Sequence, residues 1–529
     1  MLDATPRFGV ADAERLAAEL FGVPGRATVL PSERDQNFLI TPTASERPAI
    51  VLKISNAEED ARLLEAQQAA LEHLASRTDL TARPVHGASG TLLLGVHGAD
   101  GRRHWVWALS HLPGRPLGTV RRRSDALYEE WGHAAGRLDA ALAGFDHGAA
   151  HRELYWDLAN ARAIIERHRP AIREHEFGAV VDVLVDRFDR YTRRLLDDLP
   201  RAIVHGDLND YNVLVGDGHD LDSRGQRVTG IVDFGDMVYS YRIADLAIAV
   251  AYAMLDSADP LSAAAHVVRG FARSFAPEEV EVAALYGLAT IRLCASACIA
   301  AVQSRQRPDN AYLDVSQSSI RRTLPALCGI PFGLAEVTLR EAAGLVPSPT
   351  AELVGAFLRR QQQFAPVLGI DPAREPVVVL DLSVSSPLLD GDVTRNDEPS
   401  LTPKIESVMR AAGAHVAIGR YDESRLLYVA PAFALGSKAT DPHRTIHIGL
   451  DLFAPAGTPV FAPLGGVVHA FADNAAPQDY GPVVILRHVT DDGTSFFTLY
   501  GHLSRASIAE WHVGASVRAG QQIAALGES

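Results

Sequence analysis

The sequence predicts an α+β protein in which a small β-rich lobe is followed by a larger helical lobe, a connector and an all-β module. Three observations support this order. Short runs of strand-forming residues dominate the first part of the chain, long segments with helical periodicity follow, and closely spaced strands broken by Gly and Pro appear near the end. The length of 529 residues leaves room for several domains.

The first lobe is expected over residues 1–113. Runs rich in β-branched and aromatic residues predict its strands, and an alanine-rich periodic stretch predicts an amphipathic helix between them. A turn-forming stretch at 97–101 separates the last two strands. The predicted elements are strands at 27–30, 37–40 and 49–54, a helix at 57–76, and strands at 91–95 and 104–112.

The rest of the chain divides by residue composition and periodicity. Residues 114–332 are predicted to form the helical lobe, and 333–400 a connector, because prolines there flank a polar run of three glutamines. Residues 401–529 are predicted to form the all-β module. The helical segments are expected near 124–143, 157–175, 177–198, 243–256, 261–275 and 278–305.

Composition excludes several classes of partner. Fifty basic residues oppose 65 acidic ones, and a net charge of -15 repels nucleic acid and anionic membrane surfaces. The longest apolar segment, about 283–302, is interrupted by Arg292, which favours a buried helix over a membrane span. With three cysteines and no secretory signal at its start, the chain is expected to be cytoplasmic.

Two short motifs point to phosphoryl transfer. Asp207, in His205-Gly206-Asp207, lies on a predicted loop between apolar runs, and Asp233 follows the buried run Ile231-Val232. Phosphoryl transfer needs an oriented hydroxyl and metal ions that neutralise the phosphates. We therefore expect Asp207 to accept a hydrogen bond from the acceptor hydroxyl, and Asn212 and Asp233 to bind Mg²⁺. Either motif alone would also fit turn residues at strand ends, but their order and spacing together favour the site.

A lysine and a glutamate upstream complete this prediction. Lys53 lies in the predicted strand 49–54, and Glu65 lies on the helix that follows it. Lys53 is expected to contact the α- and β-phosphates of a nucleotide, and Glu65 to hold Lys53 in place.

At these residues the chain resembles the aminoglycoside phosphotransferase/choline kinase-like branch of the protein-kinase fold, over about residues 10–330. The stretch 30–38 contains no glycine, unlike the Gly-rich loop of protein kinases, and together with 52–56 it is most similar to hydroxylysine kinases. The resemblance implies a bilobal protein-kinase-like fold, ATP or GTP as donor, and Mg²⁺. It also implies a small acceptor, an amino alcohol or hydroxy amino acid of the hydroxylysine, ethanolamine or choline type.

Neighbouring residues leave two interpretations open. An acceptor with an ammonium group needs carboxylates, for which Asp236, Asp157 and Glu153 are candidates, and Trp156 could add a cation–π face. Asp157 could equally cap a helix while Trp156 lies in the core. A further carboxylate, Asp245, is expected to have a structural role: it would pair with Arg242 behind the loop that carries Asp233.

A second constellation lies in the last module. His447 and Asp451 are four positions apart on a predicted strand, so both can face one metal ion, and His502 follows about fifty residues later. Alternatively, His447 and Asp451 satisfy each other. A water-activating zinc centre uses three protein ligands, and the sequence offers two good ones.

The module resembles lysostaphin-type zinc metallopeptidases over about residues 443–529. By that resemblance His447 and Asp451 bind Zn²⁺ and His502 is a catalytic histidine. The closing His-x-His motif of the family is expected just after Gly527, where the sequence stops at Ser529. The zinc site therefore looks incomplete, and no peptidase activity is expected of this chain: the module belongs to a longer protein or serves as a spacer.

Kinase and lysostaphin-like modules of this kind also occur together in one long fusion. There they precede a class III, pyridoxal-phosphate-dependent aminotransferase or phospholyase domain. The resemblance thus implies such a domain as a partner within the full-length protein.

Overall fold

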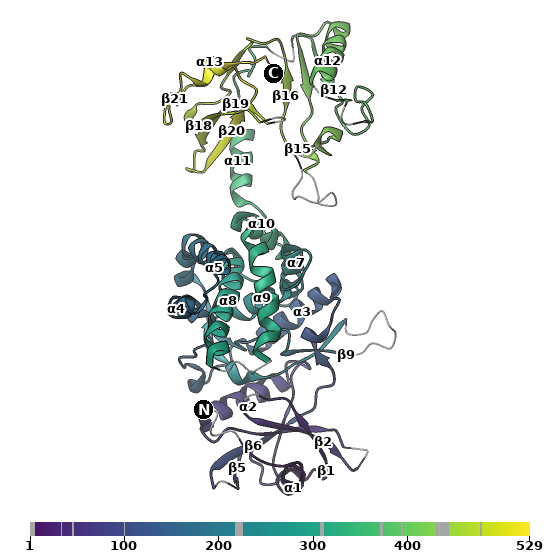
Figure 1. The fold of residues 1–529 in the computed structure, drawn as a ribbon, viewed down its shortest axis with the longest axis vertical. Helices are drawn as coiled ribbons and strands as arrows, with labels where there is room; N and C mark the ends of the chain where they lie inside the picture. Colours follow the sequence, from purple (N-terminus) through teal and green to yellow (C-terminus); the bar gives the residue numbers. More distant parts are fainter. Residues whose placement is uncertain are drawn as a thin grey trace. The chain divides into compact units, whose positions relative to one another are not determined.

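The computed structural model shows two compact units, Met1–Pro347 and Ser348–Ser529. Figure 1 shows the elements of each. The structure describes residues 6–528 except 33, 45–46, 100, 217–225, 307–311, 371–373, 393–394, 397, 430–432, 434–443 and 477–478.

The first unit begins with an antiparallel sheet in the order β1-β2-β3-β6-β4, with β5 paired to β6. Strand β3 buries Ile50, Leu52 and Ile54 on one face, because alternate side chains of a strand point to the same side. This lobe contains α1 (Val10–Phe21), β1 (Gly25–Leu30), β2 (Gln36–Pro42), β3 (Ile50–Ile54), α2 (Ala61–Ala75), β4 (Pro84–Val85), β5 (Leu94–His97) and β6 (Arg103–Ser110).

The predicted strands of this lobe are confirmed within a few residues, but its helices differ from the prediction in two ways. Helix α2 starts at Ala61 rather than 57, because the Asp60 side chain caps it by accepting a hydrogen bond from the Arg62 amide at 3.0 Å. Helix α1 was not predicted. It buries Ala13, Leu16 and Ala17 in the same core as the sheet.

Helices make up most of the second lobe, as predicted. Figure 1 shows them gathered on one side of the sheet of the first unit. The helix predicted over 177–198 is irregular beyond Arg187, where a π-helical turn and a 3₁₀ turn complete it. The helices are α3 (Asp125–Leu142), α4 (Ala161–His168), α5 (His175–Arg187), α6 (Ala244–Ala253), α7 (Pro260–Ala272), α8 (Glu279–Gln306), α9 (Tyr312–Cys328) and α10 (Phe332–Ala342).

Helix α8 is the apolar centre of this lobe. Among the described residues, the segment Glu279–Ser304 is the one helix long and apolar enough to cross a membrane by length and composition. However, 94% of its most apolar window is buried inside the protein. The buried helix expected from the sequence is therefore present.

Two small sheets between the helices carry the site loops. Strand β8 (Arg201–Val204) pairs with β11 (Val238–Tyr241), and β9 (Val213–Gly216) lies between β10 (Arg227–Ile231) and β7 (Arg115–Pro116). The segment between β8 and β9 contains Asp207, and the segment between β10 and β11 contains Asp233.

The second unit is β-rich rather than all-β. Helix α12 belongs to it, and β12 pairs in parallel with β13. Its sheets run β12-β13-β16, β14-β15, β17-β22 and β20-β19-β18-β21. The elements are α11 (Pro349–Arg360), β12 (Val377–Leu380), α12 (Glu398–Ala412), β13 (Val416–Gly419), β14 (Glu423–Ser424), β15 (Ile446–His447), β16 (Asp451–Phe453), β17 (Pro459–Phe461), β18 (Gly466–Asn474), β19 (Gly481–Val489), β20 (Ser495–Tyr500), α13 (Arg505–Ile508), β21 (Ser516–Val517) and β22 (Gln522–Ala525).

The structure divides the predicted connector, 333–400, between the two units. Helix α10 buries Ala335 and Leu339 in the core of the first unit. Strand β12 instead belongs to the second unit, where it buries Leu380. The connector prediction followed proline content, which marks the ends of elements but does not reveal which core they join.

Helices α3 and α7 pack backbone against backbone. A Cβ atom added to Gly132 would lie 1.8 Å from the Val267 carbonyl oxygen, and one added to Gly270 would lie 1.9 Å from the Glu129 carbonyl oxygen. Backbone atoms cannot move aside as side chains can, so glycine is required at both positions.

We expect Gly132→Ala to destabilise the first unit by about 3 kcal/mol, because the two helices must separate to admit a methyl group. Gly333→Ala is the matched control, since Gly333 lies in α10 and nothing lies within 4 Å of its would-be Cβ. That change should be neutral or add about 0.5 kcal/mol through helix propensity. Differential scanning calorimetry measures both; equal effects would contradict the packing argument.

Candidate active site

The two site loops lie against each other through their backbones. The Val232 amide donates to the Asn212 carbonyl at 2.9 Å, and the His205 ring contacts the Val232 carbonyl at 3.0 Å. Gly206 has φ +83°, and a Cβ there would lie 2.3 Å from the Asp236 carbonyl oxygen. Glycine is therefore needed for this close approach.

A buried carboxylate holds the Asp207 loop from behind. Asp245 is fully buried, and it accepts hydrogen bonds from the His205 amide at 2.7 Å and the Gly206 amide at 2.9 Å. Asp245 thus has a structural role, as predicted, but it does not pair with Arg242 as expected. Arg242 pairs instead with Glu281 and Glu278, at 2.6 and 2.7 Å.

The Asp207 carboxylate is held by donors on both oxygens. Its Oδ1 accepts from Arg292 Nη2 at 2.7 Å, and its Oδ2 accepts from Asn209 Nδ2 at 2.8 Å and Asn212 Nδ2 at 3.1 Å. The Asn212 Nδ2 also donates to the Asp207 carbonyl at 2.8 Å. Because this amide nitrogen is used on Asp207, the Asn212 Oδ1 points the other way and can bind a cation.

Asp233 is placed by an unusual backbone. It has φ +69°, in the left-handed region, and its Oδ1 accepts from the Gly235 amide at 3.2 Å. Asp233 is exposed to solvent by its accessible surface, although many protein atoms lie around its carboxylate. Burial would raise the pKa of Asp233, but Lys53, the Gly235 amide, His205 and Arg34 hold that pKa below its ordinary value. An ionised carboxylate results, as Mg²⁺ binding requires.

Asp236 differs from its neighbour. Burial, with the nearby Asp207 and Asp233, raises the pKa of Asp236, against the opposing influence of Arg34 and Arg292. Three carboxylates thus influence one another in one small region.

Lys53 and Glu65 are not paired. The Lys53 Nζ lies 4.8 Å from the centre of the Trp107 ring and influences Asp233, whereas Glu65 is exposed on α2. No ion pair joins the two within the described part of the chain. The structure therefore departs from the predicted pair, because α2 turns other residues inward.

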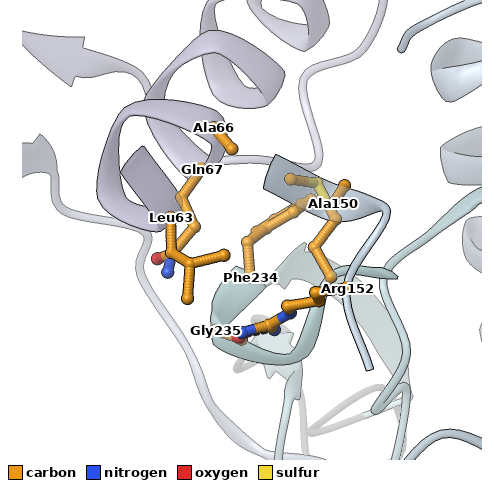
Figure 2. Close-up of a pocket in the computed structure, with 8 residues that line it drawn as sticks. Leu63, Ala66, Gln67, Ala150, Arg152, Phe234 and Gly235 are labelled. Atoms are coloured by element: carbon orange, nitrogen blue, oxygen red, sulfur yellow. Dashed lines mark hydrogen bonds between the residues drawn. The ribbon is translucent and has the colours of Figure 1, made fainter. Parts of the chain in front are cut away.

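The inward face of α2 contacts the loop that carries Asp233. Figure 2 shows Leu63 and Gln67 of α2 lining a small pocket with Phe234, and Arg152 on its other side. The Arg152 Nη2 donates to the Gly235 carbonyl at 2.6 Å. This face of α2 thus packs against the loop that carries Asp233.

The acceptor candidates have mixed outcomes. Asp157 caps the short turn that follows it, accepting from the Ala159 amide at 3.0 Å, and it also accepts from the Ser240 hydroxyl. Its capping alternative is thus confirmed. Trp156 packs against the core, and Glu153 is exposed. Asp236 is the one of these carboxylates with a pKa raised by Asp207.

Sequence reasoning missed two arginines of the site, Arg292 and Arg152. Arg292 had a visible signal, since it interrupts an apolar helix, and a charge in such a helix needs a buried partner. Arg152 had none, because its role depends on how the chain folds around Gly235.

In the second unit, His447 and Asp451 face each other. The His447 Nε2 lies 3.4 Å from Asp451 Oδ1 and has no hydrogen-bond partner among the described residues, while the Nδ1 contacts the Tyr428 hydroxyl at 2.6 Å. Burial and Arg425 lower the pKa of His447 against the effect of Asp451, so the ring is neutral at pH 7. A neutral ring with a free nitrogen suits a metal ion.

Few other groups surround this pair. The Asp451 Oδ2 forms an ion pair with Arg425 Nη1 at 2.6 Å, and Arg425 is buried. His502 is exposed, with φ +54°, and its ring centre lies 6.4 Å from that of Tyr480. The described residues contain no group of three or more His, Cys, Asp or Glu placed to hold a metal ion. His447 and Asp451 thus fit two positions of a zinc site.

Comparison with known proteins finds one matching family model in each unit. The model of the phosphotransferase enzyme family matches residues 26–283, and that of peptidase family M23 matches residues 445–529. Relatives include the hydroxylysine kinase of Mus musculus, 32% identical over 323 residues, which are 58% of this chain and 85% of that protein. The hydroxylysine kinase of Danio rerio is 28% identical over 344 residues, covering 61% and 93%.

Two solved structures show a weaker similarity. A microcompartment-associated aminopropanol kinase matches with 16% identity and a TM-score of 0.46, over 64% of this chain and all of that chain. An amicoumacin kinase in complex with AMP-PNP, Ca²⁺ and Ami matches with 15% identity and a TM-score of 0.46, over 61% and 95%.

A buried acid behind the site generates a pH prediction. Asp139, in α3, is buried, and neither of its carboxyl oxygens has a hydrogen-bond donor among the described residues. Burial first, then Asp245 and Glu281, raise the pKa of Asp139 well above its ordinary value. The folded state therefore keeps a proton on Asp139 that the unfolded chain releases, and stability falls as the pH rises toward the raised pKa.

Asp139→Asn removes this ionisation, so we expect the variant to gain stability over the wild type as the pH is raised from 5 to 8, by about 1 kcal/mol or more. Asp79→Asn is the control, because Arg137 lowers the pKa of Asp79 at an exposed position, and its loss should give no gain. Thermal unfolding at several pH values measures both. A gain that does not depend on pH would contradict the buried-acid interpretation.

Proposed function

The chain belongs to the phosphotransferase enzyme family through its first unit, and on that premise we propose that this unit transfers a phosphoryl group from ATP or GTP to the hydroxyl of a small amino alcohol or hydroxy amino acid. Acceptors of the hydroxylysine, ethanolamine or choline type fit this proposal. The relatives that support it most directly are hydroxylysine kinases.

The observation that carries the proposal is the held carboxylate of Asp207. An acceptor hydroxyl that donates to Asp207 has its oxygen lone pair free for in-line attack on the γ-phosphorus. The new O–P bond forms as the bond from this phosphorus to the bridging oxygen breaks, ADP or GDP leaves, and the hydroxyl proton passes to the carboxylate. Because donors fix both oxygens of Asp207, the carboxylate need not reorganise during the reaction.

Other residues of the unit serve the nucleotide. Asn212 Oδ1 and the ionised Asp233 would hold Mg²⁺, which when bound neutralises phosphate charge. Lys53 lies close enough to influence Asp233, and it would reach the phosphates without the predicted support of Glu65. In this proposal, Trp107 beneath the Lys53 ammonium takes over part of that support.

The charge of the site supports an amino-bearing acceptor. Asp207, Asp233 and Asp236 meet near the proposed point of transfer. Burial first, and then the like charges of Asp207 and Asp233, raise the pKa of Asp236. An ammonium group beside Asp236 would relieve this repulsion. We therefore place the amino group of the acceptor near Asp236.

The setting of the reaction follows from the same proposal. A nucleotide-dependent kinase of small molecules works in the cytoplasm, and neither nucleic acid nor a membrane is needed as a partner. A phosphorylated amino alcohol is a substrate for elimination or transamination, so an aminotransferase or phospholyase domain of the same protein is the proposed consumer of the product.

A second candidate function belongs to the second unit. The match of residues 445–529 to peptidase family M23, together with the facing His447 and Asp451, favours a zinc-dependent hydrolase. The alternative is a non-catalytic scaffold, since a water-activating zinc centre uses three protein ligands and two are placed together here.

The kinase proposal is tested by nucleotide turnover with 5-hydroxylysine, ethanolamine, choline, homoserine and an aminoglycoside in parallel. We expect ADP or GDP release with at least one of them, and a loss of kcat of about 10²- to 10⁴-fold in Asp207→Asn, because the variant cannot take the proton. Asp186→Asn, an exposed acid on α5, should keep full activity. Full activity in Asp207→Asn would reject the mechanism.

The peptidase candidate is tested by metal analysis. With two ligands in place, the chain should bind Zn²⁺ only weakly and lose the metal to a mild chelator, and His447→Ala should abolish the weak binding. His415→Ala is the control for loss of a histidine elsewhere in the same unit. Stoichiometric zinc that survives the chelator, together with cleavage of a glycine-rich peptide, would reverse the ranking of the two functions.

A further inference from the structure

Arg292 is a buried cation at the centre of the apolar helix α8. Its side chain is 6% exposed, and its Nη2 lies 2.7 Å from Asp207 Oδ1. An unpaired buried charge costs several kcal/mol, so a cation at this position must have a partner. Here the partner is the carboxylate that is proposed to receive the acceptor proton.

The remaining contacts aim the guanidinium at Asp207. The Nη1 donates to the Trp156 carbonyl at 2.9 Å, and the guanidinium carbon lies 5.5 Å from the centre of the Trp156 ring. The Nε has no hydrogen-bond acceptor among the residues that the structure describes. The side chain of Tyr252 also interacts with the guanidinium.

The geometry of the carboxylate shows what this bond does. Asn209 and Asn212 hold Oδ2 from the Asp207 loop itself, whereas Oδ1 is held only by Arg292 among the described residues. Two donors on one oxygen leave the carboxylate free to tilt about that oxygen. A third donor, from a separate and rigid helix, removes this freedom.

We propose that Arg292 is a positioning residue for phosphoryl transfer: it fixes the plane of the Asp207 carboxylate relative to the acceptor hydroxyl. The inference rests on the proposed function, since it assigns Arg292 a role in the same reaction. Arg292 acts through Asp207, which it contacts directly.

A competing role for the same arginine is recognition of an acceptor carboxylate, as in a hydroxy amino acid. The two roles differ in measurable ways. Loss of a positioning residue lowers kcat equally for acceptors with and without a carboxylate, whereas loss of a recognition residue raises KM for the carboxylate-bearing acceptor alone.

The experiment compares Arg292→Gln and Arg292→Lys with the wild type, using 5-hydroxylysine and ethanolamine at saturating nucleotide, or whichever acceptors of each kind turn over. We expect Arg292→Gln to lower kcat about 10- to 100-fold with each acceptor, and KM for nucleotide to change less than about twofold. Arg292→Lys should recover part of kcat, because one charged donor is kept but the planar fork is lost.

Two controls separate positioning from folding. Arg340→Gln removes another buried arginine, 4% exposed and paired with Glu279 at 3.1 Å, which contacts no residue of the site in the described part of the chain. The Arg340→Gln variant should keep kcat. The second control combines two changes: in an Asp207→Asn background, Arg292→Gln should lower kcat little further, because the Asp207 carboxylate that Arg292 positions is already lost. Thermal unfolding verifies that each variant is folded. If Arg292→Gln does not fold, Arg292→Lys takes its place in the comparison of kcat.

The outcomes are distinct. Wild-type turnover with unchanged kcat in both Arg292 variants overturns the inference and leaves the proposed function intact. The same holds if the loss is confined to KM of the carboxylate-bearing acceptor, if it is matched by Arg340→Gln, or if it persists in full in the Asp207→Asn background. Absence of wild-type turnover with every acceptor rejects the proposed function, and the inference with it.

Discussion

The first unit depends on one buried interaction, the pair of hydrogen bonds from the His205 and Gly206 amides to Asp245. These bonds fix the backbone just before Asp207, and the Val232–Asn212 bond then aligns the second loop with the first. A carboxylate is suited to this task because charge-assisted bonds to backbone amides are short and strong. If this anchor moved, the backbone that carries Asp207 would move with it.

Electrostatic crowding is the second constraint. Asp207, Asp233 and Asp236 lie close enough to perturb one another, which alone would oppose folding. Cations from distant parts of the chain offset this repulsion: Lys53 comes from a strand of the β-rich lobe, and Arg292 from a helix of the second lobe. The site is thus assembled from both lobes, and each lobe supplies a cation to it.

The second unit shows how a shared motif can differ in its surroundings. His447 and Asp451 face each other as ligands of one ion would, yet Asp451 also pairs with the buried Arg425. A cation bound by Asp451 must therefore share this carboxylate with a guanidinium, which weakens the attraction that the carboxylate offers a metal ion. The neighbouring arginine is a property of this unit that the spacing of His447 and Asp451 does not reveal.

Much of this protein could be read from its sequence, because strand alternation, helical periodicity and two loop motifs are local signals. They gave the order of lobes and the meeting of Asp207, Asn212 and Asp233. The tertiary structure decided what depends on rotation and long-range packing: Glu65 faces solvent because of how α2 is turned, Asp245 binds backbone amides rather than Arg242, and Arg292 reaches Asp207 across 85 positions of sequence. Sequence spacing fixes neither the face a helix buries nor the partner of a buried charge.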